Sequence, residues 1–400
     1  SALSRPAAPA ERAHKIQATD RILDDACTLL AGLRLGIADS IIQTHFRHTL
    51  SIDTLKNLLK SAALLTKKYA PQTENIQSFL EAERGDSLKL LFDAWQASQT
   101  FNELHEIPHL QAEGTWENNP FAARKFILEK VEGLDPTTWW RIPAFVSSLK
   151  KYYPDFQRPA GNYEAWYLRD TRTGDYMRGE QHWDAVEGEL IRFSLRGPFF
   201  WLGLVSLAAV DNESVPSAFR LTKLAGNLIA GTPPKLKAET QNLNADSKLT
   251  LQIPPLFPRA VRYQLARFCQ WQGFKKENYL YRITPASLNA ALEQGLKVKH
   301  LLTLLRAHTS TSLPPNLVQS LDRWDQEGTQ IHLEHTLVLR VNNPKILTTL
   351  RKSRAARFLG DPLGPTSIVV NQGAWQSVMD ALAELGYLGQ VEEMEENLND

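Results

Sequence analysis

The chain has 400 residues, of which 43% are hydrophobic and 22% are charged, and its formal net charge is +1 at pH 7. This composition predicts a globular protein of roughly two to four small domains. The near-neutral charge excludes a global attraction to nucleic acid or membrane, so any such binding must come from local patches. Apolar runs stay well short of the ~20 residues that span a bilayer, so we expect no membrane partner. Cys27 and Cys269 lie within apolar helical patterns, which predicts buried, reduced thiols and a cytoplasmic location.

The first hundred residues predict a helical bundle behind a loose start. Residues 1–20 are rich in Ala, Pro and Arg and lack the apolar core of a signal peptide, so we expect a mobile lead-in. Residues 21–100 have helical periodicity, clearest over 22–33. Ser51 or Asp53 is the expected N-cap of a further helix. Several short helices with short turns predict a helix-turn-helix-like bundle.

Residues 101–181 have the element order of a winged helix. A helix is predicted over 121–131, a short strand over 139–142 and a second helix over 143–153. Two aromatic runs then flank a glycine turn within 166–178, which predicts a β-hairpin. Helix, strand, helix and hairpin together predict the first of two winged-helix units.

Residues 182–234 predict a second winged-helix unit. Gly197-Pro198 interrupts the helical pattern, and residues 219–222 are expected to form a short strand before a closing helix. The polar residues 235–248 then predict a linker between domains.

Residues 249–390 predict a further domain that contains a compact helical module at 279–328. Thr284 is the expected N-cap of its first helix, and Pro285 suits the first helical position, where a missing N–H costs nothing. The module contains no catalytic constellation, so it favours a docking role over chemistry.

The last part of the chain predicts a small α/β arrangement and a tail. Alternating apolar residues over 331–341 predict one or two strands, and 368–370 predicts another. Helices are expected over 344–350 and 374–385. Residues 391–400 are acidic and are expected to be disordered.

One short motif resembles a zinc site. His105-Glu106-Ile107-Pro108-His109 matches H-E-x-x-H, in which two histidines one helical turn apart hold the metal. Pro108 removes a backbone donor and disfavours the α conformation of the residue before it. We therefore expect the helix to end near Glu106, with surface histidines and no metal.

Other histidine and tryptophan groups favour structural roles. The pairs His45/His48 and His332/His335 lack an obvious third ligand. Base-stacking platforms are the alternative role of the tryptophans, but most lie within apolar patterns that predict core packing. The adjacent Trp139 and Trp140 are the exception, because neighbouring residues of a strand face opposite sides.

The glycine patterns that hold phosphate are missing. The sequence contains no G-x-x-x-x-G-K-[ST], G-x-G-x-x-G or G-x-S-x-G pattern. The expectation is a protein that is not an enzyme and needs no cofactor.

The segment 249–390 resembles the helicase XPB/Ssl2-type N-terminal domain family, which also occurs in bacterial helicase-associated proteins. The residues that carry this resemblance are Tyr281 to Leu288, Ala290-Ala291, Glu293 to Gly295, Leu301 to Leu305, Leu313 to Pro315, Trp324, Ile368 to Val370 and Leu385 to Leu388. Upstream, Asp155 to Pro159, Trp166 to Asp170, Trp183 to Gly188, Gly197 to Gly203 and Phe219 to Thr222 resemble the winged-helix regions of those bacterial proteins. In the eukaryotic translocase of this family the equivalent domain holds a partner subunit. The resemblance therefore implies protein docking here, with a helicase or a repair or transcription factor as the expected kind of partner.

Two groups of basic residues are candidate binding sites. A winged helix places one helix in the major groove and its hairpin on the phosphate backbone, which predicts duplex DNA contacts from Lys150, Lys151, Arg169, Arg172 and Arg178. Acidic neighbours of the hairpin reduce its positive charge. A second basic run predicts a patch for an anionic partner, with a solvated helix face as the alternative; it consists of Lys345, Arg351, Lys352, Arg354 and Arg357.

Together these patterns predict an α+β fold that is mostly α, with tandem winged-helix-like units followed by an XPB-N-terminal-like α/β docking domain. The expected function is a non-catalytic DNA-associated scaffold that docks a protein partner. The alternative is a protein-binding adaptor without nucleic-acid affinity, and a metal hydrolase is a third hypothesis.

Overall fold

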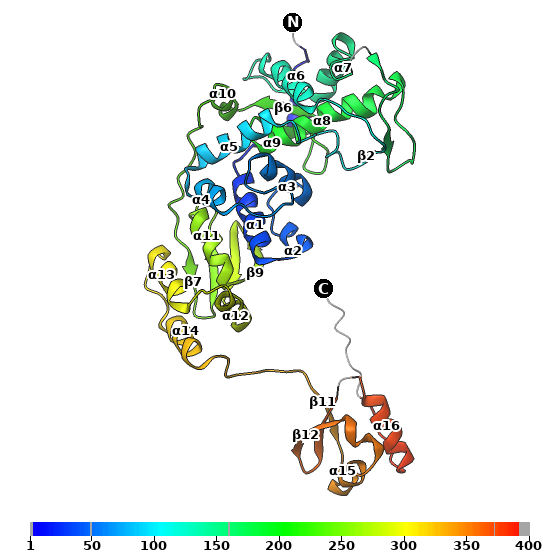
Figure 1. Cartoon of the computed structure of the whole chain (residues 1–400), viewed down its shortest axis with the longest axis vertical. Helices are drawn as coiled ribbons and strands as arrows, with labels where there is room; N and C mark the ends of the chain where they lie inside the picture. Colours follow the sequence, from blue (N-terminus) through cyan, green and yellow to red (C-terminus); the bar gives the residue numbers. More distant parts are fainter. Residues whose placement is uncertain (1–2, 49, 159–160, 372, 392–400) are drawn as a thin grey trace. The chain divides into compact units, whose positions relative to one another are not determined.

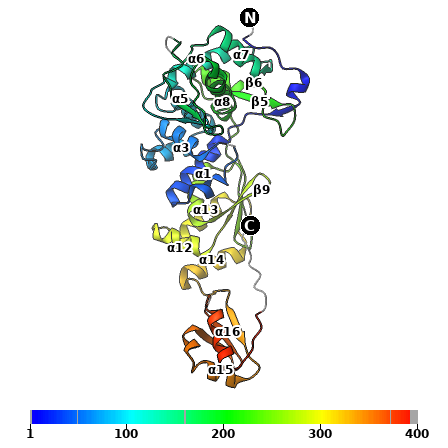
Figure 2. The same ribbon diagram turned by 90° about the vertical axis from the view of Figure 1, so that its right-hand side faces the viewer.

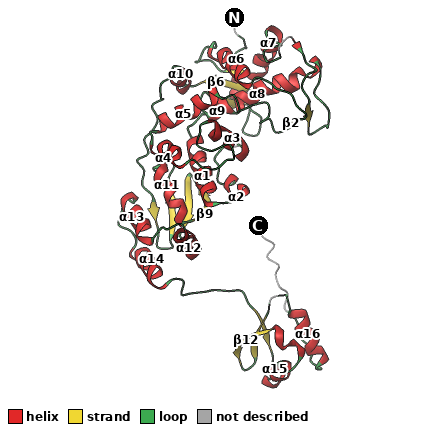
Figure 3. Ribbon diagram, viewed as in Figure 1, coloured by secondary structure: helices red, strands yellow, loops and turns green. Residues whose placement is uncertain are grey.

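The computed structural model describes residues 3–48, 50–158, 161–371 and 373–391. The chain divides into two compact units, Ser1–Gly328 and Thr329–Asp400. As the sequence predicted, the fold is α+β and mostly helical, with small antiparallel sheets (Figures 1 and 3). The boundary between the units differs from the predicted one, because it falls inside the domain expected over 249–390. Residues 392–400, most of the predicted acidic tail, lie outside the described residues.

The first unit begins with the predicted helical bundle. Its helices are α1 (Ile22–Leu35), α2 (Asp39–Gln43), α3 (Ile52–Ser61), α4 (Thr73–Glu81) and α5 (Arg84–Ala97). The Ser51 side chain accepts a hydrogen bond from the backbone N–H of Thr54, which confirms Ser51 as the N-cap of α3. The helix α1 ends at Gly36, whose φ of 66° is a left-handed conformation that glycine adopts without strain.

The N-terminal residues differ from the predicted mobile lead-in, because they are part of a sheet. Strand β1 (His14–Ile16) pairs antiparallel with β5 (Val205–Ala209). Further upstream, the N–H of Ala7 donates to the carbonyl of Trp139 over 2.7 Å. Partners more than a hundred residues away in the sequence hold this segment, and no local pattern indicates them.

The two predicted winged-helix units share one sheet. Its order is β1-β5-β6-β3, where β3 (Trp140–Arg141) lies in the first predicted unit and β6 (Ala218–Leu221) in the second. The helices around it are α6 (Pro120–Glu132), α7 (Ile142–Tyr152), α8 (Glu189–Arg196), α9 (Pro198–Trp201) and α10 (Lys223–Ile229). The strand pairing joins the two predicted units into one body.

The predicted hairpin forms, and it gains a third strand. The N–H of Met177 donates to the carbonyl of Leu168, and that of Asp170 to the carbonyl of Asp175. Strand β4 (Leu168–Asp170) also pairs antiparallel with β2 (Leu110–Ala112). The hairpin is therefore attached to the segment that precedes α6.

The C-terminal part of the first unit contains the predicted helical module. A sheet of order β7-β8-β10-β9 consists of β7 (Asn244–Ala245), β8 (Thr250–Ile253), β9 (Gln270–Lys275) and β10 (Asn278–Arg282). The helices are α11 (Arg259–Leu265), α12 (Pro285–Glu293), α13 (Val298–His308) and α14 (Pro315–Glu327), which lie close to this sheet (Figures 1 and 2). The Thr284 hydroxyl accepts from the N–H of Ser287 over 3.1 Å, which confirms the predicted cap.

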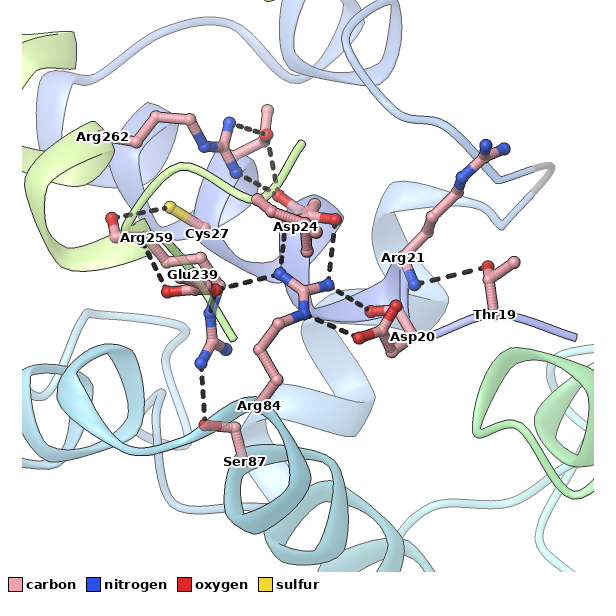
Figure 4. Close-up of polar contacts among 12 residues, drawn as sticks. Thr19, Asp20, Arg21, Asp24, Cys27, Arg84, Ser87, Glu239, Arg259 and Arg262 are labelled. Atoms are coloured by element: carbon pink, nitrogen blue, oxygen red, sulfur yellow. Dashed lines mark hydrogen bonds and ion pairs between the residues drawn. The ribbon is translucent and has the colours of Figure 1, made fainter. Parts of the chain in front are cut away.

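Buried arginines join the helical bundle to α11 (Figure 4). The Arg84 guanidinium lies 2.7 Å from Asp20, 3.0 Å from Asp24 and 2.9 Å from Glu239. Arg262 of α11 donates to the backbone carbonyl of Asp24 over 2.7 Å. Arg84, Asp24 and Arg262 are almost fully buried, so the network holds α1, α5 and α11 in fixed relative positions.

A close approach of the chain to α5 makes one glycine necessary. A Cβ atom at Gly85 would lie 2.1 Å from the carbonyl oxygen of Pro234. Gly→Ala inside a helix usually stabilises a protein by ~0.5–1 kcal/mol, but here we expect Gly85→Ala to destabilise by about 1–3 kcal/mol because backbone must move. Urea unfolding of the full chain measures this change. Gly226→Ala in α10 is the matched control, because nothing lies within 4 Å of its Cβ position. A Gly85→Ala variant as stable as the parent would contradict the prediction.

The described part of the second unit is a three-stranded sheet with two α-helices and a short 3-10 helix, Arg354–Phe358. Its order is β11-β13-β12, from β11 (Leu337–Arg340), β12 (Leu359–Gly364) and β13 (Ser367–Val370). The helices are α15 (Pro344–Leu350) and α16 (Trp375–Glu384). A small core of Leu350, Ala355, Val370, Val378, Ala381 and Leu382 holds them together. The strand predicted to start at Ile331 begins only at Leu337.

Candidate nucleic-acid interface

The helix α7 has one apolar face and one basic end. Ile142, Phe145, Val146 and Leu149 are buried, so the helical period places Lys150 on the exposed side. Lysines in the last turn also interact favourably with the partial negative charge at the C-terminal end of the helix. The sequence pattern therefore fixes where these charges lie.

The two predicted lysines of α7 are exposed and have no acidic partner among the described residues. The Nζ atom of Lys150 lies 5.5 Å from the centroid of the Trp183 ring, and that of Lys151 lies 5.1 Å from the Tyr152 ring. Contacts with ring faces leave the positive charge in place. Both ammonium groups are therefore available to an anion.

Aromatic side chains adjoin these lysines. Tyr152 is 59% exposed and Tyr153 is 39% exposed. The Nζ of Lys130, from α6, lies 4.4 Å from the centroid of the Tyr153 ring. We call Lys130, Lys150, Lys151, Tyr152 and Tyr153 the α7 surface. The sequence analysis missed Lys130 and the two tyrosines, although four consecutive basic and aromatic residues at a helix end are a signal that could have found the tyrosines.

Two of the predicted hairpin arginines are paired with carboxylates. Arg172 binds Asp170 through two hydrogen bonds, of 2.7 Å from Nη2 and 3.1 Å from Nε. These hydrogen bonds hold the pKa of Asp170 well below its usual range. Arg169 lies 3.6 Å from Glu113, which belongs to the segment after β2. The acidic partners reduce the positive charge that the hairpin offers to phosphate.

The third hairpin arginine is paired as well. The Arg178 side chain lies 3.3 Å from the carboxylate of Glu164 and donates to its backbone carbonyl. It also lies 4.7 Å from the centroid of the exposed Tyr167 ring. Within the described ranges, no hydrogen bond, ion pair or ring contact joins the hairpin arginines to Lys150 or Lys151. The five predicted residues therefore fall into two groups of different electrostatic character.

The basic patch of the second unit lies on α15, on the turn after it and on the short 3-10 helix Arg354–Phe358. All five of its predicted residues are exposed: Lys345, Arg351, Lys352, Arg354 and Arg357. Arg354 is paired with Glu384 of α16. Arg357 lies 4.6 Å from the centroid of the Phe358 ring. The other four cations make no ion pair with a described residue.

The H-E-x-x-H motif does not form a regular helix. Residues 103–106 are turns, and Glu106 accepts hydrogen bonds from Thr54 and Asn57 of α3. His105 contacts Trp116 edge-on, and burial lowers the pKa of His105. Among the described residues there is no group of three or more ligands that could hold a metal ion.

Among the described residues, the other two histidine pairs also lack the further ligands that a metal site requires. His45 accepts from the N–H of Gly273 over 3.1 Å, and His48 lies 2.8 Å from Asp25. His332 and His335 are exposed and lie before β11 rather than on a strand.

The tryptophans considered as stacking platforms are part of the core. Trp139, Trp140, Trp166, Trp183 and Trp201 are all buried. The adjacent pair is accommodated because Trp140 belongs to the main core, whereas Trp139 packs in a small cluster on the other face of the sheet. Core packing is confirmed for all five.

Residues 243–361 match the family described as helicase conserved C-terminal domain. This match supports a helicase-related protein without distinguishing the XPB/Ssl2 N-terminal type. No curated protein matches the chain. Both cysteines are buried and free, and no helix in the described ranges is long and apolar enough to cross a membrane.

The match corrects the expectation that the chain is not an enzyme. Helicase-family proteins are typically ATPases, so a helicase domain argues against a non-enzymatic protein. The expectation relied on three glycine patterns, and these describe only some of the ways in which proteins hold a nucleotide. The absence of these three patterns is therefore not enough to predict that the protein is not an enzyme.

Proposed function

We propose that this chain is a DNA-associated, helicase-related protein whose α7 surface contacts the phosphate backbone of duplex DNA. The observation that carries the proposal is a pair of exposed lysines, Lys150 and Lys151, that have no acidic partner in the described part of the chain and lie beside two exposed tyrosines. Unpaired lysines release counterions from DNA on binding, whereas paired arginines must first give up a carboxylate. The helicase match supports a nucleic-acid context.

The order of elements supports a single winged-helix unit as the scaffold. In chain order it includes α6, β3, α7, α8 and the β5–β6 hairpin, with β4 inserted between α7 and α8 and α9 between α8 and β5, and β3 pairs with β6. In the common docking mode, α8 would enter the major groove and the β5–β6 loop would touch the backbone. Arg192 of α8 is paired with Asp184 and Glu189, and the loop contains Asp211 and Glu213. These carboxylates disfavour that mode, so we place the contact at the end of α7.

Salt-dependent binding to a mixed-sequence duplex tests this proposal. We expect fluorescence anisotropy to show binding at low salt that weakens with rising salt. Neutralising Lys150→Gln and Lys151→Gln together should reduce the slope of log K against log salt by about 0.9 per lost phosphate contact. The matched control is Arg169→Gln with Arg172→Gln, which removes the same formal charge from side chains that are already paired, so a smaller change is expected.

Two results would contradict the proposal. One is no binding at low salt. The other is binding that does not change when Lys150, Lys151, Arg169 and Arg172 are neutralised together. A single-stranded oligonucleotide of the same sequence separates duplex contact from base stacking on Tyr152, because stacking requires unpaired bases.

A protein-binding adaptor is the second candidate function. An open hollow of about 870 Å³ lies beside β6 and α10, and its lining includes Leu134, Leu221, Leu224 and Ile229. Apolar linings of this kind suit a partner's apolar side chains. The four unpaired cations of the second unit would suit an acidic partner. Absence of DNA binding at low salt would favour this candidate.

A further inference from the structure

Strand β11 has an unpaired edge. It is the outer strand of the order β11-β13-β12, and among the described strands it pairs only with β13. Just beyond β11, the N–H of Val341 donates to the carbonyl of Thr366 over 2.9 Å. Hydrogen-bonded positions alternate in an antiparallel pair, so Leu339 also bonds towards β13. The N–H and C=O groups of Val338 and Arg340 then point to the open edge.

An apolar hollow lies along the same edge. It has a volume of about 340 Å³ and lies between β11, α16 and residues 390–391. Its lining includes Leu337, Leu339, Trp375, Val378 and Met379. The backbone of the edge and the hollow on its helix side together offer what an added strand requires, which is hydrogen bonds and a pocket for alternate side chains.

The segment just before β11 has the pattern of the strand that would fill this site. Ile331 is 86% exposed and Leu333 is 100% exposed. They continue the alternation of Leu337 and Leu339, yet residues 329–336 form no strand within the described chain. Two largely exposed aliphatic side chains two positions apart indicate a surface that becomes covered.

We propose that two copies of this chain associate by antiparallel pairing of residues 331–341, on a two-fold axis near Thr336. In this register Leu333 lies opposite Leu339 of the second copy, and Ile331 lies opposite Val341. The period of two places all four side chains on the helix side of the sheet, so Leu333 enters the hollow of the second copy. The two three-stranded sheets become one continuous sheet.

The charges along the segment agree with this register. Glu334 lies opposite Val338 of the second copy and is the diagonal neighbour of its Arg340. Among the described residues Arg340 has no ion pair of its own. The interaction site is separate from α7, so the proposal does not depend on DNA binding.

Sedimentation velocity of the full chain over a concentration series tests the proposal, and we expect a monomer–dimer equilibrium. Leu333→Glu places a charge in the hollow and should raise the dimer dissociation constant by at least about tenfold. Val338→Pro should act similarly, because it removes an edge N–H that does not bond to β13. Leu363→Glu is the matched control, since Leu363 is 60% exposed on the opposite edge strand β12, and it should leave the equilibrium unchanged.

A chain that stays monomeric at every concentration would overturn the proposal. So would a dimer that survives both Leu333→Glu and Val338→Pro, or one that Leu363→Glu dissociates. Leu333 lies outside every described strand, so its variant keeps the test decisive even if the proline variant fails to fold. Far-UV circular dichroism checks the fold of each variant.

Discussion

Replacing Arg84 with methionine is expected to lower the free energy of unfolding of the first unit by about 3–5 kcal/mol. The guanidinium is buried, with only 2% of the side chain exposed, and it bonds Asp20, Asp24 and Glu239. Methionine fills a similar volume but leaves the buried carboxylate of Asp24 without its cation. The cost is therefore the desolvation of unpaired charges rather than the loss of a surface contact.

Urea unfolding followed by tryptophan fluorescence measures this loss. Arg21→Met is the control, because Arg21 and its partner Glu277 are 44% and 64% exposed and an ion pair of that kind contributes only ~0–1 kcal/mol. If Arg84→Met costs no more than the control, the network of Figure 4 does not stabilise the fold.

Glu103→Ala is the second substitution with a large expected effect, again about 3–5 kcal/mol. The Glu103 carboxylate lies 2.7 Å from Nε of Arg124 and 3.0 Å from its Nη2, and it accepts from the Trp95 indole over 2.8 Å. Burial raises the pKa of Glu103, although Arg124 opposes that shift. Alanine would leave the guanidinium of Arg124 buried with backbone carbonyls as its only hydrogen-bond acceptors.

The thermal unfolding midpoint checks the Glu103 prediction. Glu103→Gln should cost less than Glu103→Ala, since the amide oxygen still accepts from Trp95 or Arg124. Glu164→Ala serves as the exposed control, because Glu164 is 64% exposed beside Arg178 and its loss should be within ~1 kcal/mol. An alanine variant at Glu103 as stable as that control would contradict the prediction.

The features that sequence analysis predicted correctly are those with local causes. Ser51 caps α3 and Thr284 caps α12 through hydrogen bonds to residues three positions ahead. The turn at Gly174 forms the hairpin because glycine adopts its φ of 83° without strain. Such signals lie within a few residues of the element that they specify.

Long-range pairing could not be predicted in the same way. Trp140 pairs with Phe219, and His14 pairs with Ala209. Nothing near either residue specifies its partner, so one sheet was divided between two predicted domains and the N-terminal strand was missed. Buried ion pairs are equally hard to predict from sequence. Arg84, for example, lies at the start of a helix, where an arginine is usually expected on the surface.

The candidate interface was predicted in part. Lys150 and Lys151 are exposed because the apolar period of α7 faces the other way. Asp170 was visible as a neighbour that reduces the charge of Arg172, but the pairing of Arg169 with Glu113 depends on β2 lying beside β4. Whether a basic side chain can bind DNA therefore depends on which segments of the chain pack beside it in the folded protein.

The network around Arg84 also bears on where this chain can be divided. The family match begins at residue 243, yet Arg262 of the matched segment has its hydrogen-bond acceptors, Thr28 and the carbonyl of Asp24, on α1. A fragment cut at residue 243 would therefore have lost the groups that satisfy a buried guanidinium. The family match therefore begins at a residue that is not the start of an independently folding unit. Gly328, where the first compact unit ends, is the better place to divide the chain.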